Sequence, residues 1–488
     1  MTVKNIVSDN TTRKNPVKIL QFGGGNFVRA FIEDFVEVLN DKTFFNGNII
    51  IVKPTKNGDY STLKSQNGHY HVVLEGIKND KPVSQTKSIK SISNIIHSYN
   101  EYDTYLDTAK IPTIRFIVSN TTESGIAYNN QDKFKESPAG EFPAKLTQWL
   151  YTRYTAFNGD PSRGCVFLPC ELIENNGAQL QQAILQYIDL WQLSKDFKEW
   201  ILNSNHFCNT LVDRIVSGYS EKIANNLYKK SGNKDALLVV GEIYHNWLIE
   251  GPDFISKELP FSETDLDVKF VNDLTPYRKL KVRVLNGAHT AMVPVAYLAG
   301  VSTVREVMEQ KELSKYIHDF LTQEVMPIMN NDFSEKEIQD FITGVITRFK
   351  NPYLEHKLLS ISLNSITKFN TRLLPTLIEY YEQKNALPNH IIFSLAALLV
   401  FYKGKFKGKE IPIKDDEKYI LFIKKQWKDF DEDQINIEKF VNNVISNKLL
   451  FQADLTQIRG FSSLLSQYIL AIVENGVLNS LKHVKPTP

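Results

Sequence analysis

The fold of this chain is decided by one stretch near its start, Val17-Lys-Ile-Leu-Gln-Phe22-Gly23-Gly24-Gly25-Asn26-Phe27-Val28-Arg29-Ala30. Its first six residues are β-prone and predict a strand, and three glycines follow as a turn. An amphipathic run at 31–39 then predicts a helix, and a second β-prone run occupies 48–52. A strand, a glycine turn, a helix and a strand in this order open a doubly wound α/β sheet.

The glycine turn has a physical use at this position. Glycines let the backbone approach the pyrophosphate of a dinucleotide, and the following helix supplies free N–H groups and a favourable dipole. Val28 replaces the third glycine of the usual pattern, so an ordinary strand-to-helix turn is the competing interpretation. The strand–helix–strand context favours cofactor binding. The candidate residues are Ile19, Leu20, Gln21, Phe22, Gly23, Gly24, Gly25, Asn26, Phe27, Val28, Arg29 and Ala30.

The end of the second strand does not decide between NAD and NADP. An NAD enzyme normally has an Asp or Glu there to hold the ribose hydroxyls. This chain instead has Lys53 followed by Pro54, with Asp59 further on. A lysine would serve a 2′-phosphate equally well, so the residues alone leave both cofactors open.

Polar residues follow two further predicted strands, at 114–118 and 164–168. The carboxyl ends of such strands are where a doubly wound sheet binds its ligand, although Ser or Thr followed by Glu is also helix-capping chemistry. Asn120 is our candidate from this edge. Asp213 is a further candidate for cofactor binding, because Asp213 and Arg214 are adjacent charges in an apolar context, which indicates pairing or function.

A second chemical signal is Lys281-Val-Arg-Val-Leu-Asn286-Gly-Ala-His289, which we interpret as part of one helix. At about 100° per residue, Asn286 and His289 share a face and Lys281 lies within about 140° of Asn286. Burial among apolar neighbours would push the pKa of a lysine toward neutrality, so that it exchanges a proton with a hydroxyl. Asn286 and His289 would hold the substrate oxygen. The competing interpretation is a solvated lysine and a locally satisfied histidine.

The composition bounds the class of protein. The chain has 488 residues, 57 basic and 55 acidic, with a net charge of +2, which argues against a nucleic-acid partner. Its three cysteines form no Cys-x-x-Cys pair, as in a reducing compartment. The polar start lacks a signal-peptide core, and no apolar run approaches the ~20 residues that span a bilayer. We expect a soluble, cytoplasmic protein with a small-molecule partner and no membrane partner.

The pattern changes near residue 275. Before it, β-type runs alternate with helical ones; after it, helices are expected at 314–329, 335–347, 358–382, 389–401, 417–430, 437–446 and 464–481. We therefore predict a Rossmann-type NAD-binding domain at 1–274 and a mainly α-helical substrate and catalytic domain at 275–488.

Neighbouring chemistries lack support in the sequence. Two Tyr-x-x-x-Lys pairs, at Tyr353 and Tyr380, lie in helical sequence far from the glycine turn. No zinc-ligand spacing, Walker lysine or Gly-x-Ser-x-Gly elbow is present. We expect no metal site.

Over its whole length the chain resembles the polyol-specific long-chain dehydrogenases, the mannitol dehydrogenase family. Three motifs in this order carry the resemblance: the turn at 22–31, Val212-Asp213-Arg214-Ile215, and Lys281-x-x-x-x-Asn286-x-x-His289. It implies that Lys281 is the general acid/base and that Asn286 and His289 contact the substrate. Within the family the chain looks most like members that interconvert D-tagaturonate and D-altronate in hexuronate catabolism. Those members are NAD-linked, which favours NAD and keeps NADP as the alternative.

One departure concerns the oxyanion. Mannitol dehydrogenases have a second Asn in a Cys-Asp-Asn or Cys-Glu-Asn segment, whereas here Leu172 follows Cys170-Glu171. Either Asn175 or Asn176 replaces it, or Asn286 acts alone. We take Asn176 as a candidate substrate-binding residue.

A uronate also needs a cation for its carboxylate. Lys368 and Arg372 are the candidates, with Arg348 as a third, and surface salt bridging is the competing interpretation. A fructuronate or mannitol/fructose-type reductase and a non-catalytic NAD-binding regulator remain alternative functions. The sequence makes no prediction of the oligomeric state.

Overall fold

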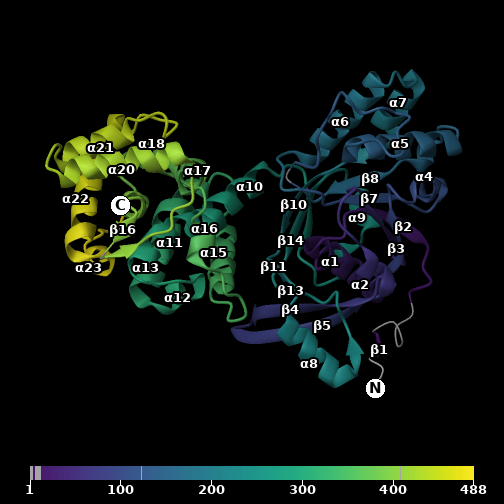
Figure 1. Cartoon of the computed structure of the whole chain (residues 1–488), viewed down its shortest axis with the longest axis horizontal. Helices are drawn as coiled ribbons and strands as arrows, with labels where there is room; N and C mark the ends of the chain where they lie inside the picture. Colours follow the sequence, from purple (N-terminus) through teal and green to yellow (C-terminus); the bar gives the residue numbers. More distant parts are fainter. Residues whose placement is uncertain (1–3, 6–11, 123, 407, 488) are drawn as a thin grey trace. The chain divides into compact units, whose positions relative to one another are not determined.

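The structure is a computed structural model that describes residues 4–5, 12–122, 124–406 and 408–487. The chain divides into two compact units, Met1–Leu274 and Thr275–Pro488, which Figure 1 shows in purple to teal and in green to yellow. Each unit has its own hydrophobic core.

The first unit is built on a parallel sheet of six strands. In spatial order these are β6 (Ile92–His97), β3 (Asn48–Lys53), β2 (Val17–Phe22), β7 (Phe116–Ser119), β8 (Val166–Pro169) and β9 (His206–Phe207). Every neighbouring pair is parallel. The order reverses between β2 and β7, which is the switch point of a Rossmann sheet.

Helices cover both faces of this sheet because its strands are apolar on both sides. Ile49 and Ile51 of β3 pack with the helices α1 (Asn26–Arg29) and α2 (Ile32–Lys42). Ile50 and Val52 face the other core. That core contains residues of α4 (Tyr102–Asp107), α5 (Phe142–Ala156), α6 (Asn176–Leu190) and α7 (Lys195–Ser204) (Figure 1).

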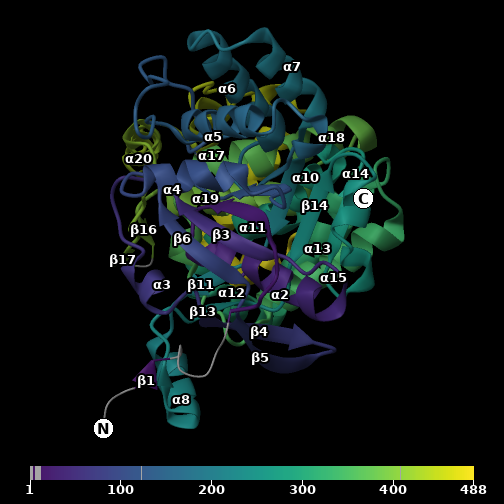
Figure 2. The ribbon, with the colours of Figure 1, turned by 90° about the vertical axis from the view of Figure 1, so that its right-hand side faces the viewer.

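Two smaller sheets complete the unit. One contains β11 (Val216–Gly218), β13 (Val239–Glu242) and the hairpin of β4 (Tyr70–Lys78) and β5 (Lys81–Ile89). The other contains β10 (Asn209–Asp213), β14 (Asn246–Glu250) and β15 (Val268–Val271). The hairpin and α8 (Glu221–Ser231) lie at the end of the unit away from α5, α6 and α7 (Figures 1 and 2). The remaining strands and α-helices are β1 (Lys4–Asn5), α3 (Ser61–Ser65), β12 (Asn233–Lys234) and α9 (Ile255–Glu258). Short 3₁₀ helices lie at Thr108–Lys110, Pro161–Arg163 and Phe261–Glu263.

The second unit is mainly helical. Its first helices are α10 (Thr275–Lys281), α11 (Gly287–Leu298), α12 (Val304–Glu309), α13 (Lys311–Asp319), α14 (Met326–Met329) and α15 (Glu335–Phe349). Then follow α16 (Leu358–Ile361), α17 (Ser365–Arg372), α18 (Leu374–Lys384), α19 (Asn389–Phe401), α20 (Glu417–Asp431), α21 (Ile437–Ile445), α22 (Phe461–Asn475) and α23 (Val477–Leu481). A two-strand hairpin, β16 (Lys405–Phe406) with β17 (Lys409–Glu410), is the exception.

The predicted fold class, a Rossmann-type domain followed by a mainly helical domain, is confirmed. Two helices that were predicted to be continuous are interrupted in the structure. The helix expected at 358–382 is three helices, because Asn364 adopts a left-handed φ of 55° and Pro375 lies in the first turn of α18. The helix expected at 464–481 ends at Gly476, whose φ is 76°.

None of the described helices combines the length and apolar character needed to cross a membrane. Within the described residues, no three His, Cys, Asp or Glu side chains gather as metal ligands.

Candidate active site

The glycine turn lies at the carboxyl end of β2. Gly23 has a φ of 104°, and its N–H donates to the Val52 carbonyl at 3.0 Å. A Cβ on Gly23 would lie 2.7 Å from the Asn120 carbonyl oxygen, and one on Gly24 would lie 3.0 Å from the Tyr60 ring. Gly23 therefore requires glycine, whereas a side chain at position 24 would press on the Tyr60 ring.

Asn120 ties this turn to the neighbouring strands. Its N–H donates to the Phe22 carbonyl at 3.0 Å, and its side-chain amide donates to the Cys170 carbonyl at 2.9 Å. The ends of β2, β7 and β8 thus meet at one edge, where a doubly wound sheet binds its ligand. Glu171 adds a further link, since its carboxylate accepts from Ser119 Oγ and from the N–H and Oγ1 of Thr121, each at 3.0 Å.

Lys53 is buried and its ammonium is used locally. Nζ donates to the Thr55 carbonyl, to Thr55 Oγ1 at 3.0 Å and to the Asn57 carbonyl at 2.6 Å. Burial lowers the pKa of Lys53. These three bonds use the three ammonium protons, so a 2′-phosphate would have to displace one of them.

Asp213 and Arg214, the adjacent charges of the sequence, differ in their surroundings. Arg214 is buried and forms an ion pair with the fully buried Asp34 at 2.9 Å, which Lys87 also contacts at 2.7 Å. Asp213 is the last residue of β10 and is half-buried. The predicted pairing is therefore found for Arg214, and it joins α2 to the smaller sheets.

Asn176 is fully buried at the start of α6. Its amide nitrogen donates to the carbonyls of Pro169, Glu171 and Thr210 at 2.9–3.2 Å, and its oxygen accepts from the N–H groups of Gly177 and Thr210 at 2.9 Å. A direct contact with a substrate would require one of these bonds to be given up. Leu172, which stands where the family has its Asn, is 65% exposed.

The Lys281–His289 segment is helical throughout, but it is not a regular α-helix. Residues Val282–Asn286 form a π turn between α10 and α11, and the Gly287 N–H donates to the Val282 carbonyl five residues back. A π turn closes on the fifth residue rather than the fourth, which turns Asn286 toward the face of Lys281. The two residues are thus closer around the axis than regular α geometry predicts. Both side chains are half-buried.

His289 lies on α11, one turn beyond Asn286, and is 8% exposed. Its ring lies 4.6 Å from the Phe349 ring and 5.1 Å from the His356 ring, measured between centroids. No described residue gives its Nε2 a hydrogen bond. Burial lowers the pKa of His289 well below its usual value, and the electrostatic influence of His356, Arg348, Arg372 and Lys368 lowers it further. The imidazole is therefore neutral at pH 7.

The cations predicted to bind a carboxylate gather around this histidine. Arg372, at the end of α17, donates to Thr290 Oγ1 at 3.3 Å, directly beside His289 in sequence. Lys368, one turn earlier, donates to the Ile361 carbonyl at 2.7 Å. Burial lowers the pKa of both Lys368 and Arg372. The site in the helical unit is therefore basic and partly desolvated, which suits an anionic group.

His356 was given no role by the sequence analysis. It lies in an irregular segment between α15 and α16, so no helical spacing connects it with His289. Tyr60, whose ring lies against Gly24, was missed for the same reason. Contacts of this kind are made by the tertiary fold and leave no local pattern.

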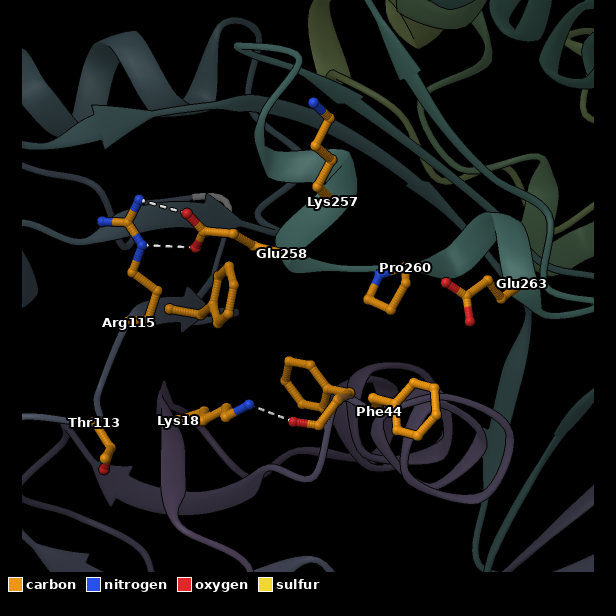
Figure 3. Close-up of a pocket in the computed structure, with 10 residues that line it drawn as sticks. Lys18, Phe44, Thr113, Arg115, Lys257, Glu258, Pro260 and Glu263 are labelled. Atoms are coloured by element: carbon orange, nitrogen blue, oxygen red, sulfur yellow. Dashed lines mark hydrogen bonds and ion pairs between the residues drawn. The ribbon is translucent and has the colours of Figure 1, made fainter.

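A hollow of about 400 Å³ lies at the opposite edge of the sheet, beside the amino ends of β2 and β7 (Figure 3). Arg115 is bound there by both oxygens of Glu258, at 2.7 and 3.0 Å, and Lys18 donates to the Phe45 carbonyl. Ligands of doubly wound sheets bind at the carboxyl ends. We therefore assign this hollow no part in cofactor binding.

The three cysteines are free and buried. Burial raises the pKa of Cys165 and Cys170, and it raises the pKa of Cys208 to about 12.

Comparison with known proteins agrees with this arrangement. The mannitol dehydrogenase Rossmann domain matches residues 17–263, and the mannitol dehydrogenase C-terminal domain matches residues 273–473. The altronate oxidoreductase of Bacillus subtilis is 43% identical over 98% of this chain and 97% of that protein. The altronate oxidoreductase of Yersinia enterocolitica is 39% identical over 95% of this chain and 96% of that protein.

Solved structures show the same fold. A D-sorbitol dehydrogenase in substrate-free form has a TM-score of 0.77, with 20% identity over 98% of this chain and 100% of that chain. Mannitol 2-dehydrogenase of Pseudomonas fluorescens, in a ternary complex with NAD and D-mannitol, has a TM-score of 0.67, with 20% identity over 97% of this chain and 95% of that chain.

A Rossmann sheet with its glycine turn, followed by a helical unit carrying lysine, asparagine and histidine on one helix, defines an oxidoreductase of the dehydrogenase class. Since both domain families match in order, and since relatives align over nearly the full length, the chain belongs to the mannitol dehydrogenase family.

Proposed function

We propose that this protein is an NAD-dependent, metal-independent tagaturonate reductase, or altronate oxidoreductase, that interconverts D-tagaturonate and D-altronate in hexuronate catabolism. The observation that carries the proposal is the basic cluster around His289, formed by Arg348, Lys368 and Arg372. A neutral polyol has no group that needs such a cluster, whereas a uronate has a carboxylate. The names of the full-length relatives support the same substrate pair.

Lys281 is the proposed general acid/base. In the reducing direction it donates a proton to the oxygen of the keto group; in the oxidising direction it takes the proton from the hydroxyl. Asn286, brought nearer to Lys281 around the helix axis by the π turn, donates its amide to the same oxygen while negative charge develops there. A bound nicotinamide supplies or accepts the hydride. Lysine and asparagine together replace the metal that other alcohol dehydrogenases use, so we expect activity to survive chelators.

Neutral His289 holds a neighbouring hydroxyl. A neutral imidazole both donates and accepts, and Nε2 is the nitrogen that lacks a partner among the described residues. Lys368 and Arg372 hold the carboxylate, and their partial burial strengthens that contact. Asn176 remains a predicted substrate-binding residue. It and Asn175 are the two candidates to replace the second Asn that mannitol dehydrogenases have where this chain has Leu172.

The cofactor cradle is the glycine turn with Asn120 and Asp213. Among the described residues, nothing lies within 4 Å of a Cβ on Gly25, so the turn is open there to the close approach of a pyrophosphate. The ammonium of Lys53 donates all three of its protons to Thr55 and Asn57, so none of them is left for a 2′-phosphate. This supports NAD over NADP.

The test is NADH oxidation at 340 nm with tagaturonate, fructuronate and fructose in parallel, for wild type and Lys281→Ala. We expect turnover on tagaturonate and a kcat lower by about 10²–10⁴ in the variant. The exposed Lys336→Ala is the matched control and should retain full activity. Faster turnover on fructuronate or fructose would contradict the substrate, and an active Lys281→Ala would contradict the proton donor. Cofactor binding without turnover on all three would favour a non-catalytic role.

A further inference from the structure

Glu33 is a fully buried carboxyl beneath the glycine turn. It lies in the first turn of α2 and is 0% exposed. Gln21 Nε2 donates to Glu33 Oε1 at 2.8 Å, and the Tyr70 hydroxyl lies 2.5 Å from Glu33 Oε2. These contacts connect α2 with β2 and with β4.

The same partners reach the glycine turn and α1. Gln21 Nε2 also donates to the Gly23 carbonyl at 2.9 Å, and the Tyr70 hydroxyl lies 3.0 Å from the Arg29 carbonyl. A carbonyl can only accept, so the amide nitrogen of Gln21 must face Gly23. Its two protons are then used by Gly23 and by Glu33 Oε1.

The number of protons available to these hydrogen bonds bears on whether the Glu33 carboxyl is protonated. Tyr70 has one hydroxyl proton, but two acceptors lie within hydrogen-bonding distance of it, the Arg29 carbonyl and Glu33 Oε2. A carbonyl cannot supply a second proton. One proton can be shared in a three-centre bond, but two separate hydrogen bonds form only if Glu33 carries a proton on Oε2 and donates it to Tyr70, which then donates to Arg29.

We propose that Glu33 is protonated in the folded protein and acts as a neutral positioning residue, which fixes the Gly23 and Arg29 carbonyls and so holds the dinucleotide turn in shape. This inference rests on the proposed function only in taking the ligand of the glycine turn to be a dinucleotide. A carboxylate at this place would also repel the phosphates of a dinucleotide, whereas a protonated acid does not.

The surroundings agree with the neutral state. Burial raises the pKa of Glu33 by more than the hydrogen bonds from Tyr70 and Gln21 and the charge of Arg29 lower it. Burial also raises the pKa of Tyr70 and of Tyr60. Arg29 is the cation nearby, but its guanidinium donates to Asn26 Oδ1 at 2.6 Å and to the Leu237 carbonyl instead.

The next residue on α2 shows the opposite state. Asp34 is equally buried, but it pairs with Arg214 at 2.9 Å and Lys87 at 2.7 Å, and the pKa of Asp34 is lowered. Two adjacent carboxyls of one helix turn are thus held in different protonation states by their partners.

The experiment compares Glu33→Gln with Glu33→Ala and Tyr70→Phe. A glutamine amide donates to Tyr70 and accepts from Gln21, so it copies the protonated acid. We expect the NADH dissociation constant of Glu33→Gln to stay within about twofold of wild type, and to rise about tenfold in Glu33→Ala and Tyr70→Phe. A tenfold weakening in Glu33→Gln, or failure of that variant to fold, would overturn the proposal.

A second readout does not depend on the cofactor. The unfolded carboxyl ionises near its usual pKa, but the folded one keeps its proton, so wild type loses stability as pH rises above about 4.5. Glu33→Gln has no such loss, and its urea midpoint should exceed that of wild type by a margin that grows from pH 5 to pH 8. Asp34→Asn, the control, should be less stable than wild type at pH 8 because two cations lose their partner.

The infrared difference between wild type and Glu33→Gln gives the state directly. We expect the C=O band of a protonated carboxylic acid at pH 7, and a carboxylate band would overturn the proposal. If wild type failed to bind NADH, the proposed function would fail, while the stability and infrared results would still decide the state of Glu33.

Discussion

At the scale of single residues, the basic cluster of the helical unit makes a prediction about substrate charge. If Arg372 holds the substrate carboxylate, as we propose, replacing it by Met removes one charge-assisted contact, which is worth about 1.5–3 kcal/mol. We expect KM for tagaturonate to rise about 10- to 100-fold and kcat to change little, measured by NADH oxidation.

The matched control is Arg305→Met, which removes an arginine that forms an exposed ion pair with Glu309. It should leave KM unchanged. An equal KM for Arg372→Met and wild type would show that this guanidinium does not hold the substrate.

His245 makes a separate prediction about acid stability. Its Nδ1 donates to the Ile243 carbonyl and its Nε2 accepts from the Asp267 N–H, both at 3.0 Å. Burial, with the charge of Arg214, lowers the pKa of His245 from 6.5 to about 4. Between pH 6.5 and pH 4, His245 is therefore protonated in the unfolded chain but mostly neutral in the native state.

The stability contribution of His245 is complete above pH 6.5 and is lost as the pH falls toward 4, by about 3 kcal/mol in total. His245→Gln, which cannot titrate, should lose less stability between pH 7 and pH 4.5 in urea denaturation. Parallel curves for the two proteins would contradict the lowered pKa.

At the scale of elements, the glycine turn offers a matched pair of substitutions. A Cβ on Gly23 would lie 2.7 Å from the Asn120 carbonyl and the φ of Gly23 is 104°, whereas no described atom lies within 4 Å of a Cβ on Gly25. Gly23→Ala should lower the free energy of unfolding by about 1–3 kcal/mol, and Gly25→Ala should change it by less than about 0.5 kcal/mol.

Binding should separate from stability in this pair. If the turn receives the pyrophosphate, a methyl group on Gly25 would still weaken NADH binding in fluorescence titration. A Gly25→Ala variant with unchanged affinity would place the phosphates elsewhere.

The elements also show what the sequence could predict. The central strands β2, β3, β7 and β8 were predicted because strands buried on both faces are continuously apolar. The hairpin strand β5 was not, since it is largely exposed and polar. The periodicity of 358–382 marks a buried face but not an unbroken backbone, so the break at Asn364 was missed.

For the candidate site, spacing along one helix predicted that Lys281, Asn286 and His289 belong together. The π turn was missed because one extra residue in a turn leaves no compositional signal. Lys368 and Arg372 were chosen for their charge and for their place in the helical domain expected to cover the site, and only the fold relates them to His289. Glu33 gave no signal, since a glutamate in the first turn of a helix is ordinary helix chemistry.

At the scale of the whole molecule, separate cores predict separate responses to heat. The core of Thr275–Pro488 and the cores of Met1–Leu274 contain different residues. We expect two calorimetric transitions, of which saturating NADH shifts one. At 100 times the dissociation constant the gain is about 2.7 kcal/mol, or roughly 5–10 °C for a unit of this size.

A single transition that moves as a whole with NADH would contradict this prediction. It would mean that the two units unfold together. Tagaturonate added without any cofactor provides the converse test, since it should raise the midpoint temperature of the other transition.

The buried cysteines have a practical consequence for labelling. A thiol reacts as its thiolate, and burial that raises the pKa of Cys165, Cys170 and Cys208 removes both access and reactivity. The native protein should therefore take up almost no maleimide at pH 7. One cysteine introduced at Phe44, which is 93% exposed, and a second on the exposed face of α20 would be the sites of dye attachment. Energy transfer between two such dyes would then report the distance between the two labelled positions during turnover, in an otherwise unaltered background.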